Sequence, residues 1–164
     1  HRIVAVSGSG RDIPVFVAGG VKNGADMARY MKEGAAGAQF ATRFIATAEC
    51  DASEGYKQRL LNASPGDITL VKSPVGMPGR ALRSPLIRRV EAGTQPPPER
   101  CVKCIVTCDG KNAPYCISKA LIAARNGDWE NGLFFCGAAG GEVNTLSTVP
   151  EQMAQIMDEW RAAQ

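Results

Sequence analysis

The sequence lacks a strong excess of charge of either sign, and it lacks long apolar runs. It carries 19 Lys and Arg residues against 16 Asp and Glu residues, which gives a formal net charge of +3. A nucleic-acid-binding surface needs basic residues gathered on one face, and so small an excess does not predict one. No apolar run approaches the roughly 20 residues that span a bilayer, and the first residues lack signal-peptide architecture. We therefore expect a cytoplasmic protein with no membrane or nucleic-acid partner.

The absence of a secretory signal also bears on the six cysteines, because disulfides are rare in reducing compartments. Four of these cysteines lie within 16 residues, in the order C-x2-C-x3-C-x7-C. Thiolates so close in sequence can hold a tetrahedral zinc ion or an iron–sulfur cluster. The spacing matches neither the bacterial ferredoxin run nor two C-x2-C knuckles, so free cysteines packed in a small subdomain are the alternative. The candidate metal ligands are Cys101, Cys104, Cys108 and Cys116.

Residues 13–44 have the pattern of a strand, a helix and a second strand. The first segment, "IPVFVAG", is apolar on both faces, as parallel strands covered by helices are. The helix is predicted to begin after an N-cap at Asn23 and to end at Gly34. The second strand is "AGAQFATRF", and the three elements together predict a parallel βαβ unit.

Small residues follow both predicted strands. Glycines at a strand's carboxyl end let backbone N–H groups approach an anion, and the helix that follows adds free donors, although a tight turn is the simpler interpretation. Consecutive parallel strands end on the same side of a sheet, so the two turns become neighbours. Such a pair forms the phosphate site of (β/α)8 barrels. The candidate cofactor-binding residues are Ala18, Gly19, Gly20, Gln39, Ala41 and Thr42.

The middle of the chain predicts further short elements. A helix is expected after a D-x-x-E capping box formed by Asp51 and Glu54, with Tyr56 and Leu60 on one face. The segment "ITLVKS" is a strand candidate. A loop follows, and then a short helix with Ser84 as its cap, Pro85 at its first position and Gly93 as its stop.

Three consecutive prolines, Pro96 to Pro98, mark the clearest boundary in the chain. We expect residues 1–93 to form one part and residues 94–164 a helical, cysteine-rich extension. The extension is predicted to contain a helix near residues 114–125, a strand or buried loop at "NGLFFCGAAGG", and a last helix with a capping box from Thr148 to Glu151. The apolar stripe of that helix is predicted to be core: Met153, Ile156, Met157 and Trp160.

The segment "IPVFVAGGVKNGADMARYMKEGAAGAQFATRFIATAECDAS" resembles the second half of nitronate monooxygenases, formerly called 2-nitropropane dioxygenases. Flavin-dependent enoyl-acyl-carrier-protein reductases are relatives of that family. The segments "KSPVGMPGRALRSP" and "PYCISKAL" are also similar to bacterial members. The resemblance implies an α/β fold: the C-terminal βαβ part of an FMN-binding (β/α)8 (TIM) barrel, followed by the cysteine-rich extension. It implies either oxidation of alkyl nitronates with oxygen or reduction of enoyl thioesters with a nicotinamide cofactor.

By position in the resemblance, Gly19 and Gly20 match the first phosphate-binding turn, and Ala41 and Thr42 match the second, which is usually Gly-Thr. Gln39 precedes the second turn and is either a cofactor contact or a structural amide in the barrel wall. The resemblance places no catalytic residue in this chain.

A closed barrel needs about 250 residues, so the resemblance implies that the earlier strands lie upstream. We expect the chain to be inert alone and to need the missing barrel half or a partner chain before it acts on a small-molecule substrate. A non-enzymatic, metal-stabilised binding module is the alternative from another functional class.

Overall fold

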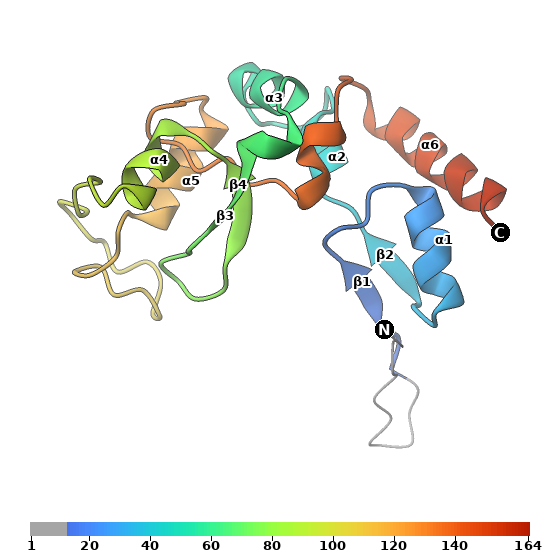
Figure 1. Ribbon diagram of the computed structural model, residues 1–164, viewed down its shortest axis with the longest axis horizontal. Coiled ribbons are helices and arrows are strands. Elements are labelled where there is room, and N and C mark those ends of the chain that lie inside the picture. The colour runs from blue at the N-terminus through green and yellow to red at the C-terminus, as the bar shows by residue number, and fades with distance from the viewer. Residues whose placement is uncertain (1–12) are drawn as a thin grey trace.

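The computed structural model describes residues 13–164 and contains two small sheets with helices packed around them (Figure 1). The β1–β2 sheet lies with α1 and α6 on the right of Figure 1, and the β3–β4 hairpin lies with α4 and α5 on the left. In chain order the elements are β1 (Phe16–Ala18), α1 (Gly24–Lys32), β2 (Gly37–Gln39), α2 (Thr42–Ile45), α3 (Glu54–Leu61), the 3-10 turn η1 (Pro65–Asp67), β3 (Ile68–Val71), β4 (Gly79–Leu82), α4 (Pro85–Glu91), α5 (Ile117–Arg125), the 3-10 turn η2 (Ala138–Glu142) and α6 (Val149–Ala162).

The predicted βαβ unit is confirmed. Strands β1 and β2 pair in parallel, with Val17 opposite Ala38. Asn23 caps α1, because its side-chain oxygen accepts a hydrogen bond from the Asp26 amide at 2.8 Å. Gly34 follows the helix with a φ of +104°, a left-handed conformation that favours glycine. Local signals in the sequence therefore determine this unit.

Helix α6, the last element of the chain, packs beside α1 (Figure 1). The predicted capping box is present, since the Thr148 amide donates to the Glu151 carboxylate at 2.7 Å and the Thr148 side chain accepts from the Glu151 amide. Ile156 is buried as predicted, but Met153 is 49% exposed and Gln152 is buried instead. The packed face of α6 is thus rotated away from Met153 and includes a polar side chain.

The sequence predicts one of the two strands of the β3–β4 hairpin. The strand β3 is confirmed, but β4 lies in residues predicted to be a loop, and it pairs with β3 in antiparallel register, with Leu70 opposite Arg80. The sequence "GRAL" contains a glycine and an arginine and shows no strand periodicity. A strand of this kind is stabilised by its neighbours, here β3 and a bridge from Ala81 to Phe135.

The apolar core consists of two clusters, and both combine residues from either side of residue 93. The first lies among the hairpin, α4 and α5 and contains Val71, Ala81, Leu86, Ile87, Tyr115, Ile117, Ala120 and Leu133. The second contains Ala46, Leu60, Leu82, Ala124, Phe134 and Cys136. The segment "NGLFFCGAAGG" is a buried loop that leads into η2, and it contributes to both clusters. The division of the chain after residue 93 remains a prediction.

Two predicted helix starts are wrong by two or three residues. Ser53, not Asp51, caps α3, because the Ser53 hydroxyl accepts from the Tyr56 amide at 3.2 Å. Asp51 instead forms an ion pair with Arg125 at 3.3 Å. Helix α5 begins at Ile117, three residues after the predicted start. None of the helices within residues 13–164 is long and apolar enough to cross a membrane.

Candidate cofactor-binding site

The first predicted turn, after β1, has an open backbone. Gly19 and Gly20 have φ values of +79° and +75°, both in the left-handed region that costs other L-residues energy. A Cβ atom built on either glycine would meet no atom within 4 Å. Within residues 13–164, no hydrogen bond uses the backbone amides of Gly20 or Val21. The turn therefore has unused N–H donors and open space beside its glycines.

The second predicted turn, after β2, is held by a distant part of the chain. Ala41 is the residue before α2, and Thr42 is the first residue of that short helix. The Thr42 hydroxyl oxygen accepts a hydrogen bond from the Gly137 amide at 2.7 Å. A hydroxyl that accepts in this way still has a proton to donate. The segment before η2 is thus fixed against the second turn.

The two turns face one pocket of about 390 Å³. Its third wall is formed by residues 137–139, by residues 142–145 and by the polar face of α6. Sequence reasoning missed this wall because its residues lie about a hundred positions beyond the turns. All of the predicted cofactor-binding residues line the pocket: Ala18, Gly19, Gly20, Gln39, Ala41 and Thr42.

Two cations border the pocket, and each has a carboxylate partner. The Lys22 ammonium pairs with Glu142 at 2.5 Å, and this hydrogen bond raises the pKa of Lys22. The Arg43 side chain is only 16% exposed and pairs with Glu159 at 3.4 Å. The acidic residues of the pocket are therefore neutralised by basic residues that follow the two turns.

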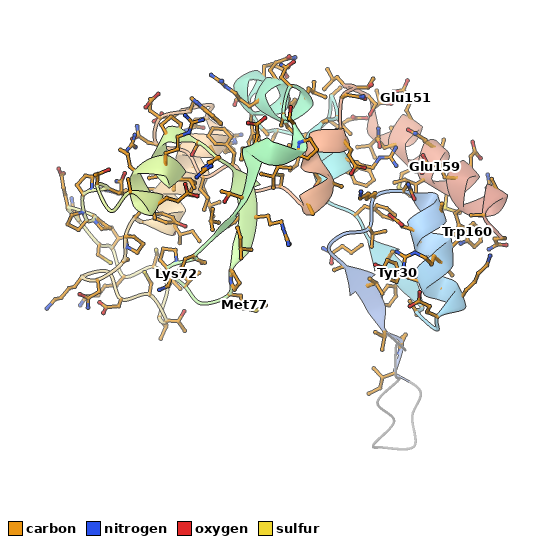
Figure 2. All side chains as sticks on the ribbon, in the orientation of Figure 1. Tyr30, Lys72, Met77, Glu151, Glu159 and Trp160 are labelled. Carbon is orange, nitrogen blue, oxygen red and sulfur yellow. The ribbon has the colours of Figure 1, made fainter. Side chains whose placement is uncertain are left out.

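Glu159 also joins the two turns to each other. Its carboxylate accepts from the Gly24 amide at 2.8 Å, at the first residue of α1. The same oxygen accepts from Arg43, whose guanidinium donates at 3.3 Å to the backbone carbonyl of Lys22. Figure 2 shows Glu159 on the side of α6 that faces the start of α1. We call Glu159, Arg43 and Gly24 the clamp.

The clamp depends on a close approach of two helices. A Cβ atom at Gly24 would lie 2.0 Å from the Ile156 carbonyl oxygen and 2.4 Å from the Trp160 nitrogen. Real Cβ atoms do not come this close to backbone atoms, so a side chain here would push α6 away. The glycine at the start of α1 thus lets α6 reach the pocket.

The four predicted metal ligands lie near one another in the fold. Cys101, Cys104, Cys108 and Cys116 line one small cleft, yet within residues 13–164 no three His, Cys, Asp or Glu side chains are arranged to hold a metal ion. The Cys101 sulfur accepts from the Lys103 amide at 3.4 Å, and the Cys104 sulfur lies 3.3 Å from the Ser118 hydroxyl. The metal site and the alternative of free cysteines both remain predictions.

Comparison with known proteins identifies the family. Residues 1–159 match the family model described as nitronate monooxygenase. The chain belongs to the nitronate monooxygenase family. A nitronate monooxygenase of Paraburkholderia phytofirmans is 31% identical over 150 residues, which are 90% of this chain and 38% of that protein. A Mycobacterium tuberculosis relative, (3aS,4S,5R,7aS)-5-hydroxy-7a-methyl-1-oxo-octahydro-1H-indene-4-carboxyl-CoA dehydrogenase, is 36% identical over 91 residues, or 56% of this chain and 25% of that protein.

Solved structures agree with this assignment. FabK from Thermotoga maritima superposes with a TM-score of 0.73 at 27% identity, covering 93% of this chain and 45% of FabK. A nitroalkane oxidase from Streptomyces ansochromogenes, at 22% identity, shares the fold with a TM-score of 0.66. This family member therefore spans less than half the length of each of these relatives.

Proposed function

We propose that the pocket between the two turns binds the phosphate of FMN, and that the chain is the phosphate-binding end of a flavin-dependent oxidoreductase built on a (β/α)8 barrel. One observation carries the proposal: turns of small residues follow two neighbouring parallel strands and line a single pocket. That arrangement is the one that holds phosphate in barrels of this kind.

The residues present fit a phosphate group. The amides of Gly20 and Val21 are free to donate within residues 13–164, and no side chain hinders their approach. The start of α1 adds the favourable end of a helix dipole. The clamp and the Lys22–Glu142 pair keep both pocket carboxylates neutralised, so these groups do not repel an anion.

Bound FMN would supply the redox chemistry at its ring, and this chain supplies the hold on its phosphate. The isoalloxazine-facing residues and the catalytic groups would come from the earlier barrel strands, on a preceding segment or a partner chain. We propose that the 164 residues alone are inert. The primary reaction we propose is oxidation of alkyl nitronates with oxygen, in line with the family and the Paraburkholderia relative.

A second candidate reaction is supported by a different relative. The Mycobacterium tuberculosis protein is a dehydrogenase of a carboxyl-CoA, which is a thioester. Reduction of an enoyl thioester with a nicotinamide cofactor on the same scaffold is therefore the alternative. The third possibility, a metal-stabilised binding module, has no supporting observation among the described residues, where no three His, Cys, Asp or Glu side chains are grouped to hold a metal ion.

The experiment is to express the complete coding sequence that contains this chain and to assay both reactions. Oxygen uptake with an alkyl nitronate is expected, with FMN copurifying. Enoyl-thioester-dependent oxidation of NADH or NADPH without nitronate turnover would favour the alternative. Nitronate oxidation by the 164 residues with added FMN would contradict the proposal that they are inert alone.

A further inference from the structure

A second cavity shares no lining residue with the pocket at the two turns, and it is rich in arginine. It measures about 480 Å³ and is lined by residues of α3, α4 and the end of β4, the elements labelled in Figure 1. The side chain of Leu82, which is 2% exposed, gives it an apolar floor. The charged lining residues are Arg59, Arg83, Arg88 and Asp67. We call this hollow the arginine cavity.

Two of the three arginines in the arginine cavity have no carboxylate partner. Within residues 13–164, four arginines take part in no ion pair: Arg59, Arg80, Arg88 and Arg100. Arg59 and Arg88 are the two of these that line the cavity. They belong to different helices, α3 and α4, so the fold brings two uncompensated cations together.

The other charged groups of the arginine cavity already have partners. Arg83 pairs with Glu91 at 2.8 Å, and the Asp67 carboxylate accepts a hydrogen bond from the Ser64 amide at 2.8 Å. The lining residues therefore carry more positive than negative charge. An anion between them would relieve the repulsion of like charges. Guanidinium groups suit phosphate in particular, because their paired N–H donors match two phosphate oxygens.

One of the unpaired arginines also lies flat on an aromatic ring. The guanidinium carbon of Arg59 is 4.4 Å from the centroid of the Trp129 indole. The indole is fixed from the core side by Phe134, at a centroid distance of 5.1 Å. Arg59 is exposed, so the guanidinium has a face turned away from the indole. Planar bases stack on guanidinium groups held in this way.

We propose that the arginine cavity binds a nucleotide, with its phosphates on Arg88 and Arg83 and its base stacked on Arg59. The volume is within the range of small-ligand sites, roughly 300–1,000 Å³. Free ADP and the ADP end of a larger cofactor such as coenzyme A present the same chemistry to such a site. The inference goes beyond the proposed function, because it uses neither of the two turns.

The test is calorimetric titration of the 164-residue chain with ADP, pyrophosphate and adenosine. We expect saturable binding of ADP that is at least about tenfold tighter than that of pyrophosphate or adenosine, because each of these lacks one half of the ligand. No binding of ADP, or an affinity for ADP equal to that for either half, would overturn the inference. Titration with coenzyme A distinguishes the two sources: tighter binding than ADP assigns the site to a cofactor, and equal or weaker binding assigns it to a free nucleotide.

Variants locate the binding site. We expect Arg59→Gln and Arg88→Gln each to weaken ADP binding at least about tenfold, because each removes a charged contact. Arg100→Gln is the matched control: it removes an unpaired arginine outside the cavity and should change the affinity less than about twofold. Equal losses in all three variants would overturn the inference. Saturating FMN should leave ADP affinity unchanged, and competition between the two ligands would overturn the inference by placing ADP at the two turns.

A measurement on the unaltered chain covers the case in which a variant does not fold. The indole N–H signal of Trp129 in the 15N-labelled chain is assigned by its loss in Trp129→Phe. We expect this signal to shift on addition of ADP, because the base stacks on the guanidinium that covers the indole. An unmoved Trp129 signal at saturating ADP would overturn the inference.

Discussion

The Glu159 carboxylate accepts a hydrogen bond from the Gly24 amide at 2.8 Å, across 135 positions of sequence. Through Arg43 the same carboxylate reaches the second turn. Glu159, near the end of α6, therefore fixes the position of the two turns relative to each other. The pocket depends on this long-range contact as well as on the local βαβ unit.

Replacing Glu159 tests the clamp. We expect Glu159→Ala to lower the free energy of unfolding by about 2 kcal/mol, because it leaves a largely buried guanidinium without its carboxylate and the Gly24 amide without its acceptor. Glu159→Gln keeps an acceptor and should lose about half as much. Urea unfolding measures the free energy of unfolding of both variants. The control Asp158→Ala removes an exposed ion pair with Arg161 on the same helix, and a loss equal to that of Glu159→Ala would contradict the role of the clamp.

Substitution of Gly24 tests the approach of α6. We expect Gly24→Ala to destabilise the fold by roughly 2–3 kcal/mol, because the added methyl would overlap the backbone of α6 at Ile156 and Trp160. Thermal unfolding provides the measurement. Gly66→Ala is the matched control, since a Cβ there meets nothing within 4 Å. If both variants were equally stable, the close contact of α1 and α6 would not be present in solution.

The capping box of α6 predicts a pH dependence. Hydrogen bonds from the Thr148 amide and hydroxyl lower the pKa of Glu151 in the folded chain. The unfolded chain then binds the proton more readily, so stability rises with pH in this range. The contribution of Glu151 to the free energy of unfolding is complete above the ordinary glutamate pKa of about 4.3. It is lost as the pH falls through the lower pKa that Glu151 has in the folded chain. Denaturant unfolding between about pH 6 and pH 3 should give a shallower slope for Glu151→Gln; an unchanged slope would contradict this.

The cysteines predict an order of chemical labelling. Cys101 and Cys104 are exposed, whereas burial raises the pKa of the Cys136 thiol to about 11. Because the thiolate is the reactive form, alkylation at about pH 8 should modify the two exposed cysteines first and Cys136 last. Mass spectrometry of the digested protein measures the order in which the cysteines are alkylated. Rapid labelling of Cys136 in the folded chain would show that the second core cluster is open.

The βαβ unit and the two turns could be predicted because their signals are local. An N-cap at Asn23, a stop at Gly34 and apolar runs of strand length identify the elements, and parallel strands bring their ends together without further information. The capping box at Thr148 located the start of α6 for the same reason.

The rest of the site could not be predicted because it depends on contacts between distant segments. Gly24 looks like an ordinary helix start, and nothing near it in sequence shows that α6 packs against it. The hydrogen bond from Gly137 to Thr42 crosses 95 positions. Cysteine spacing likewise gives no information on whether four sulfurs come together, and the structure shows that all four line one cleft.

The central claim is that this chain holds a flavin by its phosphate. Titration of the 164-residue chain with FMN and with riboflavin, followed by calorimetry, tests it most directly, because the two ligands differ only in the phosphate. We predict saturable binding of FMN that Gly20→Val weakens strongly, since valine disfavours the left-handed backbone that Gly20 adopts. Riboflavin should bind at least about tenfold more weakly, a difference of about 1.4 kcal/mol. Equal affinity for FMN and riboflavin, or no effect of Gly20→Val, would contradict the account.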